Sequence, residues 1–282
     1  MNNHKQSTEE KIVRALKEAS ALLITAGAGM GVDSGLPDFR GNEGFWKAYP
    51  PIAKLGIGFA EMANPRWFET KPRLAWGFYG HRMNLYRNTI PHKGFEMLLT
   101  LGLKMSGGYF VFTSNVDGHF QKAGFDKEKI VECHGSIHHL QCTGPCCAEI
   151  WDGKQIKVEV DKESFEAQEP LPLCPHCGKL ARPNVLMFGD WSWVPHRTEF
   201  QHIRMNEWMD KILRAGHKLL VIELGAGIAV PTVRYESENR AEQSGGILLR
   251  INPRDDQAPA GHLSLTMRAL EGIEYIDRLR QD

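Results

Sequence analysis

The sequence has no excess charge and no long apolar run, and each absence excludes a class of protein. Its 282 residues include 34 Lys and Arg and 34 Asp and Glu, so the formal net charge is zero. No overall field steers the chain to nucleic acid or to an anionic membrane, and we expect neither as a partner. No stretch approaches the roughly 20 apolar residues of a membrane span, and the polar amino terminus leads into no apolar signal core.

Cysteine is also scarce, with six residues in the chain. This number is too small for a disulfide scaffold at this length, and most of the cysteines gather in one segment at metal-ligand spacing. We therefore expect a protein of the reducing cytoplasm. The sequence shows no internal repeat, and its hydrophobic content of 42% is sufficient for one large domain with a small insert.

Apolar runs recur along the chain, and each one ends in polar or glycine-rich residues. Runs of this kind are typical of parallel strands that are buried on both faces. Because ligands of open α/β sheets bind beyond the carboxyl ends of the strands, we expect these ends to converge on one crevice. The sequence predicts an α/β fold, a Rossmann-like parallel sheet with helices on both faces. The predicted strands are Ala21–Thr25, Tyr109–Thr113, Lys129–Cys133, Lys218–Leu224 and Gly246–Ile251.

Three further segments have a composition of their own. A capping signal that begins at Ser7 predicts a first helix over Glu9–Ser20. Residues 41–91 are rich in aromatic side chains and predict a helical cover over the crevice. Residues 141–182 are polar and cysteine-rich, and they predict a small module held by a metal in place of an apolar core. We expect a single domain over residues 1–282, whose Rossmann-like part comprises residues 9–40, 92–140 and 183–282.

A glycine-rich turn follows the first predicted strand. Gly27, Ala28 and Gly29 can bring backbone N–H groups close to a phosphate, and both glycines can adopt positive φ. A helix that starts near Val32 would add its positive end. The glycines alternate and so depart from G-x-G-x-x-G, which disfavours an ordinary dinucleotide-binding dehydrogenase. The alternative is a tight turn held by a local salt bridge.

The cysteine spacing predicts a zinc site. Cys174 and Cys177 are separated by two residues, as in a zinc knuckle, and the other two ligands are Cys142 with either Cys146 or Cys147. The proline before Cys146 restricts the turn and favours this residue. Four protein ligands leave no open position, so the zinc is expected to be structural. The alternative is a set of buried reduced thiols.

The glycine-rich segment resembles the GAG-x-S-x-x-SGIPDFR signature of the sirtuins, the NAD-dependent protein deacylases, and the likeness extends from Leu22 to near Asn252. The resemblance implies NAD as cofactor and a structural four-cysteine zinc module. It also implies that Asp38 and Arg40 shape the nicotinamide pocket, while Phe39 shields the reacting centre from water.

Two further motifs carry the likeness. Ser114, Asn115 and Asp117 resemble the T-Q-N-I-D motif, which implies that Asn115 and Asp117 hold the nicotinamide ribose and carboxamide. Ser114 is shorter than the usual glutamine, and a capped strand-to-helix turn is the structural alternative. His134 lies in a segment like E-x-H-G-S, which implies a general base, with space for the sugar at Gly135. His134 and Asn115 are the predicted catalytic residues.

Near the carboxy-terminal strands, Gly225 and Ala226 stand in the place of a G-T-S segment. Ala226 lacks the usual hydroxyl, so backbone amides would have to contact the cofactor instead. Asn252 and Arg254 resemble the adenine-ribose end of the site.

Two segments resemble substrate-binding elements. Val185, Phe188 and Gly189 lie in a segment like the one that pairs with a substrate peptide, and they would line an acyl-lysine tunnel. Tyr79 and Arg82 resemble the Y-x-x-R pair by which desuccinylase-type sirtuins bind the carboxylate of an acidic acyl group. The alternative packs Tyr79 on the aromatic residues and leaves Arg82 solvated.

The resemblance therefore implies NAD-dependent removal of acetyl, succinyl or malonyl groups from protein lysines, which yields nicotinamide and O-acyl-ADP-ribose. Acylated proteins or peptides are the expected partners, and a monomer is the expected state. One alternative is a mono-ADP-ribosyltransferase or NAD hydrolase that uses the same site. Another is a non-catalytic NAD-sensing or zinc-stapled interaction module.

Overall fold

The computed structural model describes residues 7–37 and 41–281. Its larger sheet consists of β1 (Ala21–Ala26), β2 (Tyr109–Thr113), β3 (Ile130–Glu132), β7 (Leu219–Leu224), β8 (Ile247–Ile251) and β9 (Leu263–Leu265). All six strands are parallel, in the order β3-β2-β1-β7-β8-β9. The predicted parallel sheet is confirmed, and β9 is an additional edge strand whose three residues are too few for a recognisable apolar run. The order reverses between β1 and β7, the position where such sheets bind ligands.

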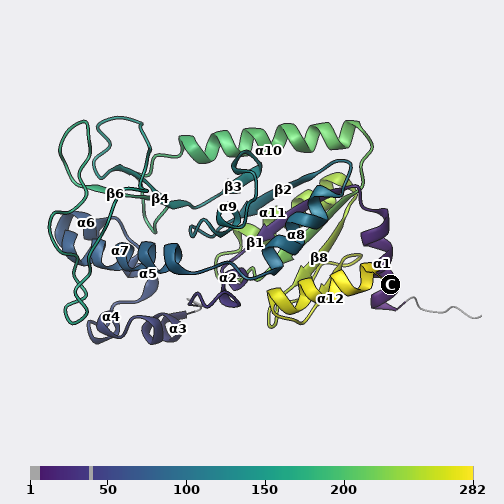
Figure 1. Ribbon diagram of the computed structural model, residues 1–282, viewed down its shortest axis with the longest axis horizontal. Coiled ribbons are helices and arrows are strands. Elements are labelled where there is room, and N and C mark those ends of the chain that lie inside the picture. Colours follow the sequence, from purple (N-terminus) through teal and green to yellow (C-terminus); the bar gives the residue numbers. More distant parts are fainter. Residues whose placement is uncertain (1–6, 38–40, 282) are drawn as a thin grey trace, which may run out of the picture.

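Helices cover both faces of this sheet (Figure 1). One face carries α1 (Thr8–Glu18), α8 (Gly94–Leu103) and α12 (Ala269–Gln281); the other carries α10 (His196–Arg214) and α11 (Thr232–Ser244). Successive residues of each strand point to opposite faces of the sheet. Leu22 packs with the helices of the first face, and Leu23 packs with those of the second. The predicted first helix is α1, and its capping box between Ser7 and Glu10 is formed.

A second lobe lies beside the sheet (Figure 1). Its antiparallel strands are β4 (Gly135–Cys142), β5 (Trp151–Asp152) and β6 (Ala181–Val185), in the order β5-β4-β6. Its helices are α3 (Gly41–Ala48), α4 (Pro50–Lys54), α5 (Phe59–Met62), α6 (Arg66–Thr70) and α7 (Pro72–Asn88). Shorter helices elsewhere are α2 (Gly29–Val32), α9 (His119–Lys122) and the 3-10 helix η1 (Lys127–Lys129).

The cysteine-rich segment does not rely on metal alone. Val158 and Phe165 belong to the same apolar core as the aromatic residues of α7. The approach is close, because a Cβ at Gly77 would lie 2.0 Å from the Phe165 carbonyl oxygen, and one at Gly80 would lie 2.3 Å from Val158 Cγ1. The expectation of a module without an apolar core was therefore wrong: its core is shared with the helical segment.

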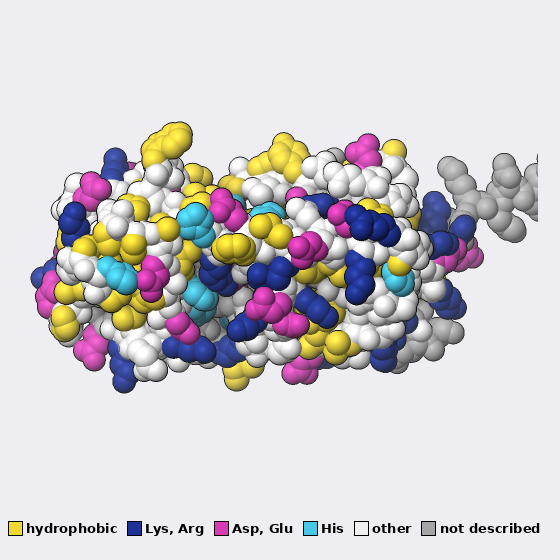
Figure 2. Space-filling model, turned by 90° about the horizontal axis from the view of Figure 1, so that it is seen from above, with side chains coloured by type: hydrophobic (Ala, Val, Ile, Leu, Met, Phe, Trp, Pro, Cys, Tyr) yellow, Lys and Arg dark blue, Asp and Glu magenta, His cyan; other side chains and the backbone are white. Residues whose placement is uncertain are grey.

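The surface agrees with the balanced composition. Seen from the side of α10, acidic and basic side chains are intermixed (Figure 2). Across residues 7–37 and 41–281, every helix is too short or too polar to cross a membrane.

Candidate active site and metal centre

The ends of β1, β2 and β7 meet at one edge of the larger sheet. Asn115, just beyond β2, donates its side-chain N–H to the Gly27 carbonyl oxygen at 2.9 Å. The Gly29 amide donates to the Gly225 carbonyl oxygen, beyond β7, at 3.1 Å. The predicted glycine-rich loops and the predicted asparagine are thus neighbours, although they lie far apart in the sequence.

The glycines of the first loop are required for close packing and not for positive φ. A Cβ at Gly27 would lie 2.8 Å from Ala226 Cα, and one at Gly29 would lie 2.7 Å from Gly225 Cα. Of these residues, Gly225 has the positive φ, at 58°. The expectation of positive φ at Gly27 and Gly29 was therefore wrong. The expected helix also differs, because α2 ends at Val32 instead of starting there.

Backbone amides at this edge divide into two groups. The amides of Gly27 and Gly29 donate to the carbonyl oxygens of Leu224 and Gly225, so they are already used within the protein. Within the described part of the chain, the amides of Ala28 and Ala226 have no hydrogen-bond acceptor. Free N–H donors of this kind suit the oxygens of a phosphate. The donor set therefore fits a dinucleotide, with Ala28 and Ala226 as donors in place of the two glycines.

Replacing Gly29 with alanine is expected to destabilise the fold, by roughly 2 kcal/mol, because the new methyl group would meet backbone atoms that cannot rotate away. Thermal unfolding of the two proteins measures this loss. Gly144→Ala is the control, since a Cβ at Gly144 meets no atom within 4 Å. Equal unfolding temperatures for Gly29→Ala and the parent protein would show that the two loops do not pack as described.

His134 lies in the short connection between β3 and β4, at the same edge of the sheet. Its imidazole is partly buried, and burial lowers its pKa, while a hydrogen bond to the Ser114 backbone acts in the opposite direction. The amide of Ser114 donates to the Ala26 carbonyl oxygen at 3.1 Å, directly before the glycine-rich loop. A neutral imidazole is thus held beside that loop, and a neutral imidazole is the form that acts as a general base.

The glycine after His134 is needed for strand packing in the second lobe. Gly135 has a φ of 76°, and a Cβ at this position would lie 2.0 Å from the Asn184 carbonyl oxygen. Gly135 pairs with Val185, so its lack of a side chain permits β4 and β6 to approach. This requirement accounts for the glycine without reference to a sugar.

Helix α10 holds the segment before His134, and the sequence did not indicate this. The buried Glu132 pairs with Arg197, and its amide donates to the Gln201 side chain at 3.0 Å. Thr198 donates its hydroxyl to the Glu132 carbonyl oxygen at 3.1 Å. These contacts join residues more than sixty positions apart, and no local motif signals them.

Asp117 makes two contacts within the turn after β2. Its carboxylate accepts a hydrogen bond from the His119 amide at 2.8 Å, at the start of α9. The carbonyl oxygen of Asp117 lies 2.8 Å from His138 Nε2. These two contacts fix the turn that presents Asn115, and the Asp117 side chain within it is mostly buried.

Asn252 also has an internal role. Its side chain is fully buried and donates to the Ala226 carbonyl oxygen at 2.8 Å. Its Oδ1 accepts hydrogen bonds from the amides of Arg254 and Asp255 at 3.1 and 3.0 Å. Asn252 thus links the ends of β7 and β8, whereas the Arg254 side chain is exposed beside them.

Tyr79 and Arg82 lie side by side within α7. Their exposed fractions are 1% and 7%, so the alternative of a solvated Arg82 does not hold. The Arg82 guanidinium lies 5.8 Å from the centre of the Tyr79 ring and donates to the Tyr86 hydroxyl at 3.0 Å. Burial raises the pKa of Tyr79 to about 12. Among the described residues the Tyr79 hydroxyl has no hydrogen-bond partner.

The segment after β6 is held by a buried ion pair. Both Asp190 carboxylate oxygens lie 2.8 Å from guanidinium nitrogens of Arg182. The Phe188 amide donates to the Ala63 carbonyl oxygen at 2.9 Å, and its ring is 42% exposed. Gly189 has a φ of 66°. Val185 is buried at the end of β6, an edge strand of its sheet.

Four cysteines form a compact cluster at the far end of β4 from His134. The Sγ atoms of Cys142, Cys146, Cys174 and Cys177 all lie within 4.8 Å of one another. Cys146, and not Cys147, is therefore the fourth member. Four sulfur atoms at this separation fit one tetrahedral zinc ion.

Hydrogen bonds within the knuckle favour the thiolate. Burial acts to raise the pKa of Cys174, but the amides of Cys177 and His176 outweigh it and lower this pKa to about 7. The thiolate is the form that binds a metal.

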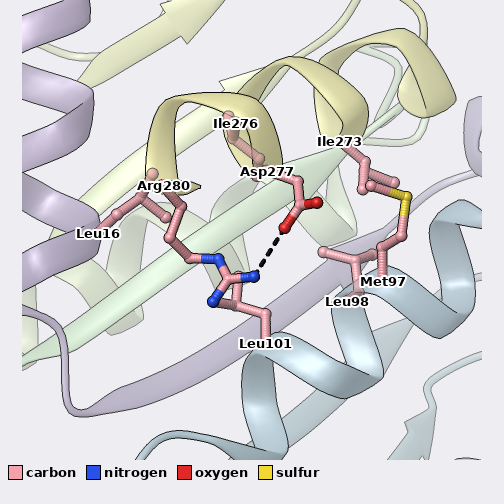
Figure 3. A pocket seen from close by; sticks show the side chains of 8 residues that line it. All are labelled: Leu16, Met97, Leu98, Leu101, Ile273, Ile276, Asp277 and Arg280. Atoms are coloured by element: carbon pink, nitrogen blue, oxygen red, sulfur yellow. Dashed lines mark hydrogen bonds and ion pairs between the residues drawn. The ribbon is translucent and has the colours of Figure 1, made fainter. Parts of the chain in front are cut away.

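A small pocket elsewhere plays no part in this site. It lies between α1, α8 and α12, is lined by apolar side chains such as Leu16, Leu98 and Ile273, and has the Asp277–Arg280 pair at one side (Figure 3). Its volume of about 10 Å³ holds no more than one water molecule.

The predicted residues Asp38, Phe39 and Arg40 lie outside the described residues.

Comparison with known proteins agrees with this geometry. A model of the Sir2 family matches residues 27–222. The NAD-dependent protein deacylase 1 of Archaeoglobus fulgidus is 30% identical over 274 residues, which cover 96% of this chain and 97% of that protein. An NAD-dependent protein deacetylase of Saccharolobus solfataricus is 31% identical over 243 residues, or 86% of this chain and 85% of that protein.

Solved structures agree as well. A Sir2 homologue in complex with NAD has a TM-score of 0.69 and 27% identity, over 99% of this chain and 97% of that one. A mutant Sir2 homologue in complex with ADP-ribose has a TM-score of 0.68 and 28% identity, over 96% of both chains. The family model spans well over half of the sequence, and the chain therefore belongs to the Sir2 family.

Proposed function

We propose that this chain is an NAD-dependent protein-lysine deacylase in which His134 is the general base. The observation that carries the proposal is the link from His134 through Ser114 to the residue before the glycine-rich loop. The relatives named NAD-dependent protein deacylase and deacetylase support the same reaction.

Different residues of the chain bind the cofactor and accept the proton. NAD, when bound, supplies the ribose carbon that accepts the acyl oxygen while nicotinamide leaves. The imidazole of His134 takes up a ribose hydroxyl proton on the ring nitrogen that is not bonded to Ser114. The amides of Ala28 and Ala226 bind phosphate oxygens, and Asn115 orients the nicotinamide end. The family resemblance assigns the shaping of the nicotinamide pocket to Asp38 and Arg40 and the exclusion of water to Phe39, all outside the described residues.

The acylated peptide would add to the second lobe. Val185 ends the edge strand β6, and Phe188 and Gly189 follow it. Main-chain pairing along this segment would accept many peptide sequences. The partly exposed Phe188 ring suits contact with the acyl-lysine stem. We also propose that the protein acts as a cytoplasmic monomer, and that residues 1–282 form one catalytic unit.

We propose further that Tyr79 and Arg82 select acidic acyl groups. Both groups are buried beside each other, and the Tyr79 hydroxyl has no partner among the described residues. Arg82→Met is expected to lower kcat/KM for a succinyl-lysine peptide roughly 100-fold, because a charge-assisted bidentate contact is lost. The value for the acetyl-lysine peptide should change only a few-fold.

The control is Arg73→Met, on the same helix but half-exposed. It should leave the ratio of succinyl to acetyl turnover unchanged. If the parent protein removes acetyl groups faster, and Arg82→Met does not alter this, the acidic-acyl proposal is rejected while the deacylase proposal stands.

The reaction itself is tested by mass spectrometry of NAD products in the presence of a panel of acyl-lysine peptides. We expect nicotinamide, O-acyl-ADP-ribose and free lysine to form in equal amounts. NAD labelled in its ADP-ribose part distinguishes a deacylase from an enzyme that transfers ADP-ribose to protein or to water. Label retained on protein, or free ADP-ribose without peptide deacylation, would identify a mono-ADP-ribosyltransferase or an NAD hydrolase instead.

A further inference from the structure

A second group of metal-ligating side chains lies beside the four-cysteine cluster. One ligand atom from each of Cys147, Glu149 and His176 lies within 4.8 Å of the other two. His176 Nε2 is 2.5 Å from a Glu149 carboxylate oxygen. Cys147 is partly buried, while Glu149 and His176 are exposed, so the group faces solvent.

We propose that Cys147, Glu149 and His176 bind a second divalent metal ion, such as zinc. This ion exchanges with metal ions in solution. A thiolate, a carboxylate and an imidazole are the three ligand types that zinc takes in proteins. Three protein ligands leave the fourth position to water, so this ion is held less tightly than the one in the four-cysteine cluster.

Electrostatics favours a second cation at this place. One dication bound by four thiolates leaves a net charge of about −2 on the cluster. Cys147 Sγ lies only 3.8 Å from Cys146 Sγ, which belongs to that cluster. The Glu149 carboxylate lies beside His176 and adds negative charge at the edge of this cluster, and a bound dication would offset that charge.

The first metal site positions the ligands of the second. His176 lies between Cys174 and Cys177, and its amide bonds to the Cys174 sulfur, so its backbone is fixed by the cluster while its ring points to Glu149. Cys147 directly follows Cys146. The second ion would therefore join the same two loops from outside, and it should bind only after the first site is filled.

The test is the zinc content of the purified full-length chain after equilibration with excess zinc and removal of unbound ions. We expect about two zinc ions per chain for the parent protein, and about one for His176→Asn and for Cys147→Ser. A mild competing chelator should remove one ion from the parent protein and leave the other in place.

The matched control is His196→Asn. His196 also lies on the surface, 3.1 Å from the Glu199 carboxylate, but it belongs to neither cysteine group. This variant should retain about two ions, like the parent protein. A single zinc ion in the parent protein under excess zinc would overturn the proposal. So would the loss of all zinc from His176→Asn, since the two sites would then not be separate.

Discussion

Replacing His134 with alanine is expected to abolish peptide deacylation, lowering kcat/KM by roughly 10² to 10⁴-fold. The physical reason is that the imidazole is the neutral basic group held at the edge of the sheet where β1, β2 and β7 end. Activity is measured by peptide mass spectrometry at saturating NAD. Binding of NAD should persist, because the amides of Ala28 and Ala226 are unaffected.

The control for this variant is His196→Ala, an exposed histidine on α10. It should retain full activity. Unfolding temperatures of both variants establish that the loss at His134 is not a loss of fold. If His134→Ala deacylates peptides at the parent rate, another group is the base and the assignment fails.

The same residue predicts the pH profile. A base acts in its neutral form, so activity is lost as pH falls through the pKa of His134 in the folded protein. Because burial lowers this pKa from the ordinary value of 6.5, the acid limb of kcat/KM should lie below pH 6.5. An acid limb above pH 7 would contradict a buried His134 as the base.

Replacing Cys174 with serine is expected to lower the free energy of unfolding by roughly 3 kcal/mol or more, because the metal that joins two loops is lost. Activity should fall as well. Cys142, another member of the cluster, is the last residue of β4, and this strand begins directly after His134. Thermal unfolding, zinc content and peptide turnover together measure the effect.

Cys147→Ser is the matched control, because Cys147 is adjacent to the cluster but not one of its four sulfur atoms. It should keep the tightly bound zinc and the activity, and its unfolding temperature should fall far less than that of Cys174→Ser. If Cys174→Ser behaves like Cys147→Ser, the four-cysteine cluster does not hold a structural metal. Treatment of the parent protein with a strong chelator should reproduce the effect of Cys174→Ser.

Local patterns predicted the elements of the larger sheet well. Its strands are apolar on both faces and end in glycine or polar residues, so each is visible in a short window of sequence. The edge strand β9 was missed because its three residues, two of them partly exposed, leave no such pattern. The choice of Cys146 over Cys147 depended on one neighbouring proline, and the structure places Cys146 in the cluster.

Predictions that depended on distant neighbours were less accurate. Gly27 and Gly29 cannot carry side chains because the backbone of the loop after β7 lies against them. This contact cannot be predicted from the residues around the two glycines. Arg82 would be exposed on an isolated helix, but the aromatic rings around it bury it. The sequence of residues 141–182 is polar and predicts no apolar core, yet Val158 and Phe165 complete a core that is supplied mainly by the helical segment over residues 41–91.

Local sequence patterns were enough to predict the order of five strands of the larger sheet, the four cysteines of the cluster, and an imidazole, an amide and glycines at strand ends. These features depend on residue type and short-range spacing, and both can be seen directly in the amino-acid sequence. The folded structure was needed to show which backbone amides of the described residues remain free, which side chains are buried, and which groups lie near Cys147. Those properties arise when segments far apart in the chain pack together, and burial then alters hydrogen bonding and charge at each site.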